Sequence, residues 1–172
     1  AEAALYGRAR ILVDWHARHR FCAVCGTPTE LFRAGWARRC GSCNAEHFPR
    51  VDPVVIMLAE CDGRVLAGRQ GGFPSGFFSA LAGFVEPGES LEEAVARELF
   101  EEAGIRVSDV AYVASQPWPF PSSLMLGFVA DPEPDEPRAH DDALEDARWF
   151  TRDEIGAALR DATDDAGLLL SP

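Results

Sequence analysis

One segment, residues 83–105, constrains the fold of this chain more than any other. Its sequence is GFVEPGESLEEAVARELFEEAGI, and its centre predicts a helix. Ser90 with Glu93 three residues later matches the capping box that begins many helices, and Gly104 is a typical residue at which a helix ends. Apolar residues recur every four positions between these ends: Leu91, Val95 and Leu99. We therefore expect a helix with one buried stripe.

The same segment carries seven glutamates and a single arginine, Arg97. Glu98, Glu101 and Glu102 share one face of the last helical turns, where the helix dipole disfavours negative charge. Like charges at this spacing destabilise a helix by roughly 0.2–0.5 kcal/mol per pair. A bound divalent cation would turn these acids into ligands, because hard cations prefer carboxylate oxygens and often bridge substrate phosphates. A solvated acidic face is the alternative interpretation.

From Gly83 to Ile105, the segment resembles the Nudix box, G-x5-E-x7-R-E-U-x-E-E-x-G-U, at every fixed position. The resemblance implies an α/β fold, the Nudix α/β/α sandwich with a mixed sheet. It also implies a pyrophosphohydrolase, which cleaves a nucleoside diphosphate linked to another moiety.

The charge balance limits the possible partners. The chain has 172 residues, of which 28 are acidic and 16 basic, so its formal net charge is −12. This argues against broad electrostatic binding to nucleic acid, and a nucleotide substrate would need a metal ion or local basic residues to offset repulsion. No transmembrane run or secretory signal is visible, so we expect no membrane association and a cytoplasmic location. Because the chain lacks an initiating Met and stops in an apolar run, we expect trimmed ends.

Four of the five cysteines form two CxxC pairs: Cys22, Cys25, Cys40 and Cys43. This spacing predicts a closed, structural zinc site, and the short segment around it indicates a zinc ribbon. Gly26 and Asn44, which follow the two pairs, tolerate the left-handed backbone of a metal-binding turn. Two disulfides or a redox pair are the alternative, but nothing in the sequence points to an oxidising compartment.

Four cysteines saturate a zinc ion, so His16, His19 and His47 are expected to be packing or surface residues. Cys61 is expected to be a bystander. Four apolar side chains are expected to pack around the metal: Phe21, Leu31, Phe32 and Trp36.

We expect the chain to divide into a linker helix at 1–20, the zinc ribbon at 21–50 and, as the resemblance implies, a Nudix hydrolase domain at 51–172. Short apolar runs predict strands at 54–59, 64–68, 77–85, 107–114, 124–130 and 147–151. Asp62-Gly63 predicts a hairpin turn between the first two strands, and a second capping box at Thr151 predicts a helix to about residue 160. The stretch 131–141, rich in proline and acids, is expected to be a loop.

A second informative segment, residues 115–123, has the sequence SQPWPFPSS. Alternate prolines cannot donate hydrogen bonds to a neighbouring strand, so we expect a stiff extended segment outside the sheet interior. Trp118 and Phe120 would then be held rigidly, as suits stacking on a flat base. An aromatic plug in the core is the alternative.

SQPWPFPxS downstream of a Nudix box, with a CxxC…CxxC ribbon upstream, resembles the NADH pyrophosphatase branch of the Nudix superfamily. The resemblance implies hydrolysis of NAD(H) to nicotinamide mononucleotide (NMN) and AMP, and removal of NAD caps from RNA 5′ ends. It further implies homodimers that use Mg²⁺ or Mn²⁺ besides the structural zinc.

The resemblance also implies roles for individual residues. Glu98 and Glu102 match the catalytic metal ligands, together with the backbone carbonyl of Ala82. Glu101 matches a further ligand or the base that activates water, and Arg97 would orient the glutamates. Phe84 sits where an aromatic stacks on the nicotinamide side. The remaining substrate-binding positions are Gln116, Pro117, Trp118, Pro119, Phe120, Pro121, Ser122 and Ser123.

One position departs from the family pattern. Ala143 stands where members carry a glutamate that serves as another metal ligand, and Asp142 or Glu145 could substitute for it. A weakened enzyme, or a module that binds NAD or RNA without cleaving it, therefore stays open. So does another Nudix substrate, such as ADP-ribose or a dinucleoside polyphosphate.

Overall fold

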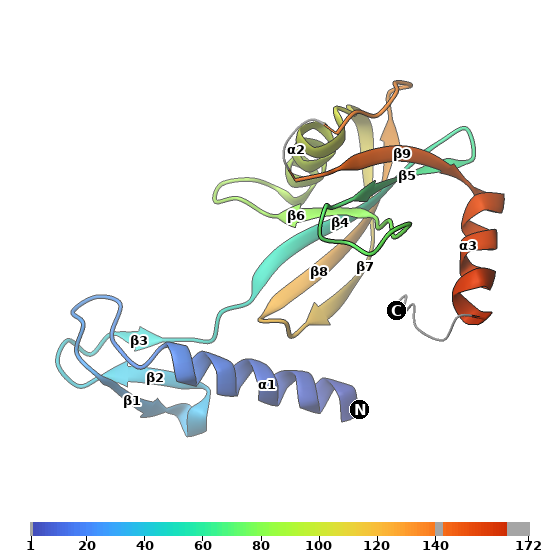
Figure 1. The fold of residues 1–172 in the computed structure, drawn as a ribbon. Coiled ribbons are helices and arrows are strands. Elements are labelled where there is room, and N and C mark those ends of the chain that lie inside the picture. Colours follow the sequence, from blue (N-terminus) through green and yellow to red (C-terminus); the bar gives the residue numbers. More distant parts are fainter. Residues whose placement is uncertain (1, 140–142, 165–172) are drawn as a thin grey trace. The chain divides into compact units, whose positions relative to one another are not determined.

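Figure 1 shows the computed structural model, which describes residues 2–139 and 143–164. The chain forms two compact units. The first contains the residues up to Val54 together with Ser115–Met125, and the second contains Val55–Ala114 and the residues from Leu126 onward. None of the helices in the described ranges has the length and apolar character needed to cross a membrane.

The first unit begins with a helix, α1 (Glu2–Arg18), within the range where the sequence predicts one. Three short strands follow: β1 (Thr29–Phe32), β2 (Ala37–Cys40) and β3 (Glu46–His47). They form an antiparallel sheet in that order, and a short 3-10 turn, η1 (Arg33–Gly35), joins the first two.

The prediction that four apolar side chains surround the metal site is wrong for three of them. Phe21, Leu31 and Trp36 are 60%, 65% and 51% exposed. A three-stranded ribbon of this size has little interior in which large apolar side chains could be buried. The buried aromatic residue of this unit comes from α1 instead, since Trp15 is 4% exposed and stacks on His19.

The larger sheet has six strands, in the order β7-β8-β4-β5-β9 with β6 paired to β4. Their bounds are β4 (Asp52–Cys61), β5 (Arg64–Arg69), β6 (Leu81–Phe84), β7 (Val107–Trp118), β8 (Ser123–Pro132) and β9 (Asp146–Thr151). β4 pairs antiparallel with β5 through a turn at Asp62 and Gly63, as the sequence predicts. The α/β fold with a mixed sheet and helices is thereby confirmed.

Five of the six strands are longer than their predicted ranges, and β6 is shorter. β6 spans four residues of the predicted nine, and Ser79 only makes an isolated pairing with Gly68. β7 runs on to Trp118, through Pro117. It can do so because β7 lies at the edge of the sheet, where a residue without an N–H does not interrupt a ladder on its outer side.

The helix of the 83–105 segment, α2 (Leu91–Ala103), has the predicted ends. Ser90 Oγ accepts a hydrogen bond from Glu93 N at 3.2 Å, and Glu93 Oε2 accepts one from Ser90 N at 2.8 Å. Gly104 ends the helix with a φ of 70°, which glycine adopts without strain. A similar capping box at Thr151 begins α3 (Arg152–Asp164).

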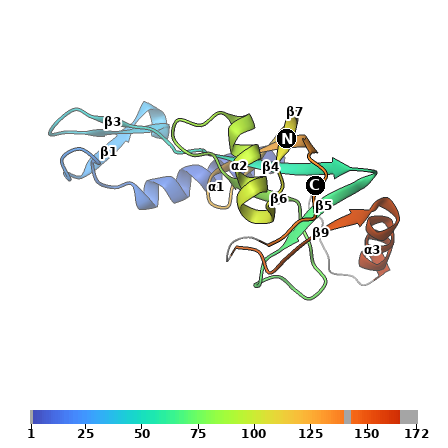
Figure 2. The same cartoon turned by 90° about the horizontal axis from the view of Figure 1, so that it is seen from above.

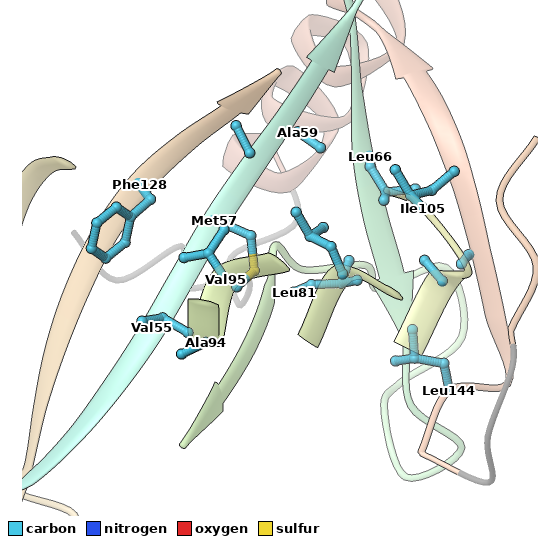
Figure 3. Packing of buried hydrophobic residues seen from close by; sticks show 14 residues of the cluster. Val55, Met57, Ala59, Leu66, Leu81, Ala94, Val95, Ile105, Phe128 and Leu144 are labelled. Carbon is cyan, nitrogen blue, oxygen red and sulfur yellow. The ribbon is translucent and has the colours of Figure 1, made fainter. Parts of the chain in front are cut away.

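α2 packs beside β6, and α3 lies on the other side of β9 from α2 (Figures 1 and 2). The core forms between α2 and the sheet, where Met57 of β4 lies next to Val95 of α2 (Figure 3). Val95 and Leu99 are fully buried, which confirms the predicted apolar stripe. The stripe fixes the rotation of α2 about its axis and so decides which acids face away from the core.

Leu99→Ala is expected to lower the free energy of unfolding by about 2–5 kcal/mol, because it leaves a cavity between helix and sheet. Leu159→Ala is the matched control, since Leu159 is also helical but 43% exposed. Urea unfolding followed by circular dichroism measures both. Equal losses in the two variants would contradict the assignment of Leu99 to the core.

Candidate active site and metal centre

Arg97 organises the acidic residues of α2 and the loop before it. Its Nε and Nη2 donate to the two carboxylate oxygens of Glu89, at 2.7 and 3.0 Å. Its Nη1 donates to Glu98 Oε1 and to Glu101 Oε2, both at 2.9 Å. Nη2 also donates to the backbone oxygen of Phe84 at 2.9 Å. One guanidinium therefore holds three carboxylates and the end of β6 in one arrangement.

The charges in this cluster reinforce each other. The hydrogen bonds with Glu89 raise the pKa of Arg97 above its ordinary value, with smaller contributions from Glu98 and Glu101. The same contact with Arg97, helped by a hydrogen bond from Glu86 N, lowers the pKa of Glu89. Arg97 and Glu89 therefore remain an ion pair throughout the neutral range, and the loop stays tied to the helix.

Gly83 leaves the space that the Glu98 carboxylate occupies. A β-carbon built on Gly83 would lie 1.8 Å from Cδ and Oε1 of Glu98, far inside van der Waals contact. The glycine is therefore required for the position of a neighbouring carboxylate and not for an unusual backbone conformation. This close approach places Glu98 against the backbone of β6, next to Ala82.

Glu102 lies on the buried side of the same helical turn and is only 8% exposed. Burial of a carboxylate is costly unless a partner compensates its charge. Glu101 lies at the surface, with 51% of its side chain exposed. The three acids of the last turns therefore occupy distinct environments, which their sequence spacing did not indicate.

The donor set fits a hard divalent cation. It combines carboxylate oxygens with the nearby carbonyl of Ala82, and the space above Gly83 admits the Glu98 carboxylate. Within the described residues these acids do not converge on one point, since only the four cysteines bring three or more potential ligand atoms within 4.8 Å. Such an open set suits a cation that is also bound by substrate phosphates.

Glu145, one of the two acids that could replace the missing glutamate at Ala143, has another partner. Its carboxylate accepts from Arg69 Nε at 3.1 Å, and its N–H donates to Arg69 O at 2.7 Å. Asp142, the other, lies outside the described residues. Arg69 also donates to three backbone carbonyls of the following loop, those of Phe73, Pro74 and Phe77. Sequence reasoning missed Arg69, because no local pattern marks it.

The four cysteines of the ribbon gather as the sequence predicts. The Sγ atoms of Cys22 and Cys43 lie 3.6 Å apart, and those of Cys25 and Cys40 lie 3.5 Å apart. Four sulfurs around one zinc ion, each with a bond of about 2.3 Å, lie about 3.8 Å apart. All four cysteines are free thiols, so the disulfide alternative is wrong. The quartet thus fits a structural zinc ion.

Two backbone turns shape this site. Gly26 and Asn44 adopt φ values of 73° and 60°, as predicted for the residues after each pair. Val24 N and Ser42 N each point at a cysteine sulfur, at 3.4 Å. These N–H groups stabilise thiolates. The hydrogen bonds with Thr27 lower the pKa of Cys25 to about 6, whereas the contacts with Cys25 and Cys22 raise the pKa of Cys43 to about 12.

His47 contributes to the same site without belonging to the quartet. Its Nε2 lies 3.3 Å from Cys22 Sγ, a hydrogen-bond distance for sulfur. His16 bonds instead to the backbone oxygen of Gly35, and His19 packs on Trp15. All three histidines therefore have packing or hydrogen-bonding roles.

The SQPWPFPSS segment is only partly extended. Gln116, Pro117 and Trp118 end β7, residues 119–122 form a turn, and Ser123 begins β8. Proline is common in turns because its φ angle is already set, which explains the difference from a fully extended segment.

The aromatic side chains of this turn lie at the surface. Trp118 and Phe120 contact each other at 5.5 Å between ring centroids and are 38% and 52% exposed. The aromatic plug is therefore wrong. Ser123 is buried, and the backbone oxygen of Ser122 accepts from Asp52 N at 2.9 Å. These residues belong to the first unit, whereas Phe84, 60% exposed, and the acids of α2 belong to the second.

Comparison with known families gives two adjacent matches. The NUDIX domain matches residues 49–170, and the NADH pyrophosphatase zinc ribbon domain matches residues 17–48. The first match covers most of the chain and contains the whole Arg97 cluster. The second contains all four cysteines.

Curated relatives are similar over most of this chain. The human NAD-capped RNA hydrolase NUDT12 is 48% identical over 164 residues, covering 90% of this chain and 36% of the relative. The NAD-capped RNA hydrolase NudC of Mycobacterium bovis is 51% identical over 158 residues, covering 90% of this chain and 50% of the relative. The chain thus spans half or less of the length of these relatives.

Solved structures show the same fold. A Nudix hydrolase from Nitrosomonas europaea superposes with a TM-score of 0.68 at 26% identity, covering 79% of this chain and 80% of that one. The chain therefore belongs to the Nudix hydrolase family, with an NADH pyrophosphatase zinc ribbon ahead of its Nudix domain.

Proposed function

We propose that this chain hydrolyses the pyrophosphate bond of NAD(H), giving NMN(H) and AMP, and removes NAD caps from RNA 5′ ends to leave a 5′-monophosphate. The observation that carries the proposal is the Arg97 cluster, which presents Glu98 above Gly83 beside the buried Glu102. Relatives named NAD-capped RNA hydrolases, at 48% and 51% identity, support this substrate class.

The proposed reaction is attack of water on one phosphorus of the P–O–P bridge. Glu98, Glu102 and the Ala82 carbonyl would hold a divalent cation, Mg²⁺ or Mn²⁺. Such a cation, when bound, offsets phosphate charge and lowers the pKa of a coordinated water. Glu101 is exposed enough to accept the proton of the attacking water, and its contact with Arg97 orients it.

The substrate's flat rings would be bound by exposed aromatic side chains. Trp118 and Phe120 form a ready-made pair for one base, and Phe84 would stack on the nicotinamide side. Because prolines precede, separate and follow Trp118 and Phe120 and restrict their backbone, little conformational entropy is lost on binding. The other substrate-binding positions proposed are Gln116, Pro117, Pro119, Pro121, Ser122 and Ser123.

The proposal also includes a homodimer, a cytoplasmic location and domain boundaries at residues 21 and 51. One observation favours a second candidate, a module that binds NAD or RNA with weak hydrolysis. Ala143 lacks a carboxylate, and the nearby Glu145 pairs with Arg69. Release of NMN(H) from NADH and from NAD-capped RNA, compared with the hydrolysis of ADP-ribose and measured with and without chelator, separates the candidates. Binding of NAD without product at millimolar Mg²⁺ or Mn²⁺ would favour the module.

Glu102→Gln is expected to lower the turnover number for NADH on the order of 10²-fold or more, because it removes a charged ligand. The fold should survive, since the amide has nearly the same shape as the carboxylate. Glu92→Gln is the matched control, an exposed glutamate in the first turn of the same helix. Full turnover by Glu102→Gln, with an unchanged melting curve, would refute the ligand assignment.

Gly83→Ala is expected to reduce kcat/KM for NADH by about tenfold or more, because the new methyl group must displace the Glu98 carboxylate. Gly72→Ala is the control, since a β-carbon at Gly72 meets nothing within 4 Å. Manganese titration monitored by electron paramagnetic resonance gives a second readout. If Gly83→Ala keeps the wild-type kinetics and manganese affinity, the observed position of the Glu98 carboxylate is not required for metal binding or hydrolysis.

Cys25→Ser is expected to abolish stoichiometric zinc binding and unfold the ribbon, because metal binding supplies on the order of 10 kcal/mol to such small modules. Cys61→Ser is the matched control, a thiol outside the quartet. Elemental analysis of zinc, together with proteolysis of the ribbon, distinguishes the two variants. Retention of zinc by Cys25→Ser would exclude the four-cysteine site.

A further inference from the structure

α1 contacts the aromatic turn through Arg10, a residue that precedes both matched domains. Arg10 Nε donates to the backbone oxygen of Pro119 at 2.9 Å. The guanidinium carbon of the same side chain lies 4.7 Å from the centroid of the Phe120 ring. A single arginine thus bonds to the backbone of the turn and covers one face of its exposed ring.

The helix backbone itself also approaches this turn. A β-carbon built on Gly7, one helical turn before Arg10, would lie 3.6 Å from Pro119 Cγ, which is ordinary van der Waals contact. Two positions on one face of α1 therefore meet the same proline. The approach of helix and turn does not depend on the rotamer of one long side chain.

We propose that Arg10 is a positioning residue for the Trp118–Phe120 pair, so that α1 contributes to the affinity for the dinucleotide. This inference rests on the proposed function, in which that pair stacks on a base. Phe120 has one face toward the Arg10 cation and also contacts Trp118, with an angle of 68° between the two ring planes. Trp118 and Phe120 are linked by this contact, so a change in the orientation of Phe120 alters the surface offered to the base.

The Arg10 contact is expected to affect substrate binding and not the global stability of the fold. The contact lies at the protein surface, where cation–π pairs and single hydrogen bonds contribute little to global stability. Loss of the Arg10 contact would therefore change the structure of the turn and not the stability of the whole fold. A contact that holds a binding element in the same way in the ground and transition states changes KM and leaves kcat unchanged.

The test compares Arg10→Gln, Arg10→Lys and Arg18→Gln in the full chain. Arg18 is the matched control, since it lies on the same helix and pairs with Asp14 at 3.0 Å. Arg10→Gln is expected to raise KM for NADH about three- to tenfold with kcat unchanged, because both contacts are lost. Arg10→Lys keeps a cation and a donor, so it should recover part of the affinity.

Hydrogen–deuterium exchange of the peptide spanning 115–125 gives a readout that needs no substrate. Exchange should rise in Arg10→Gln and not in Arg18→Gln. A wild-type chain that does not hydrolyse NADH would refute the proposed function. Wild-type turnover with equal KM values in Arg10→Gln and Arg18→Gln would instead refute the positioning role, whether or not the exchange changes. A parallel loss of kcat would refute it as well.

Discussion

Two of the acids proposed to act in catalysis, Glu98 and Glu101, are held in place by the Arg97 guanidinium. Its five N–H groups lie in one plane, and this geometry lets it pair with both oxygens of Glu89 while it also reaches Glu98 and Glu101. Without a central cation, glutamates one turn apart would repel each other and spread into solvent. With it, the end of β6, the loop and α2 form one rigid piece. The apolar stripe of α2 then places that piece on the sheet.

The ribbon also has ligands arranged around the place of a cation, but these ligands are thiols. In the Arg97 cluster an organic cation gathers carboxylates, and in the ribbon the spacing of thiols suits an inorganic one. Both arrangements bring ligands from separate segments together. The two glycine or asparagine turns after the CxxC pairs serve the thiols, whereas the missing β-carbon of Gly83 serves Glu98.

Much of this arrangement could be predicted from sequence because it is local. Caps at Ser90 and Gly104, the stripe of α2 and the paired cysteines all act within a few residues of each other. Contacts between distant segments leave no local pattern in the sequence, so they could not be predicted. The pairing of Arg69 with Glu145 joins residues 76 positions apart, and that of Arg10 with Pro119 spans 109. The exposure of the ribbon's aromatic residues also depends on how little core so small a module has.

Because Gly83 and Glu98 are in close contact, the substitutions allowed at one position depend on the residue at the other. A larger residue at position 83 is compatible with the backbone only if the side chain at position 98 shortens or swings away. Either change removes the carboxylate, so the effects of substitutions at the two sites cannot add. Glycine at position 83 and glutamate at position 98 are therefore expected to be kept together, because the carboxylate needs the space that the glycine leaves.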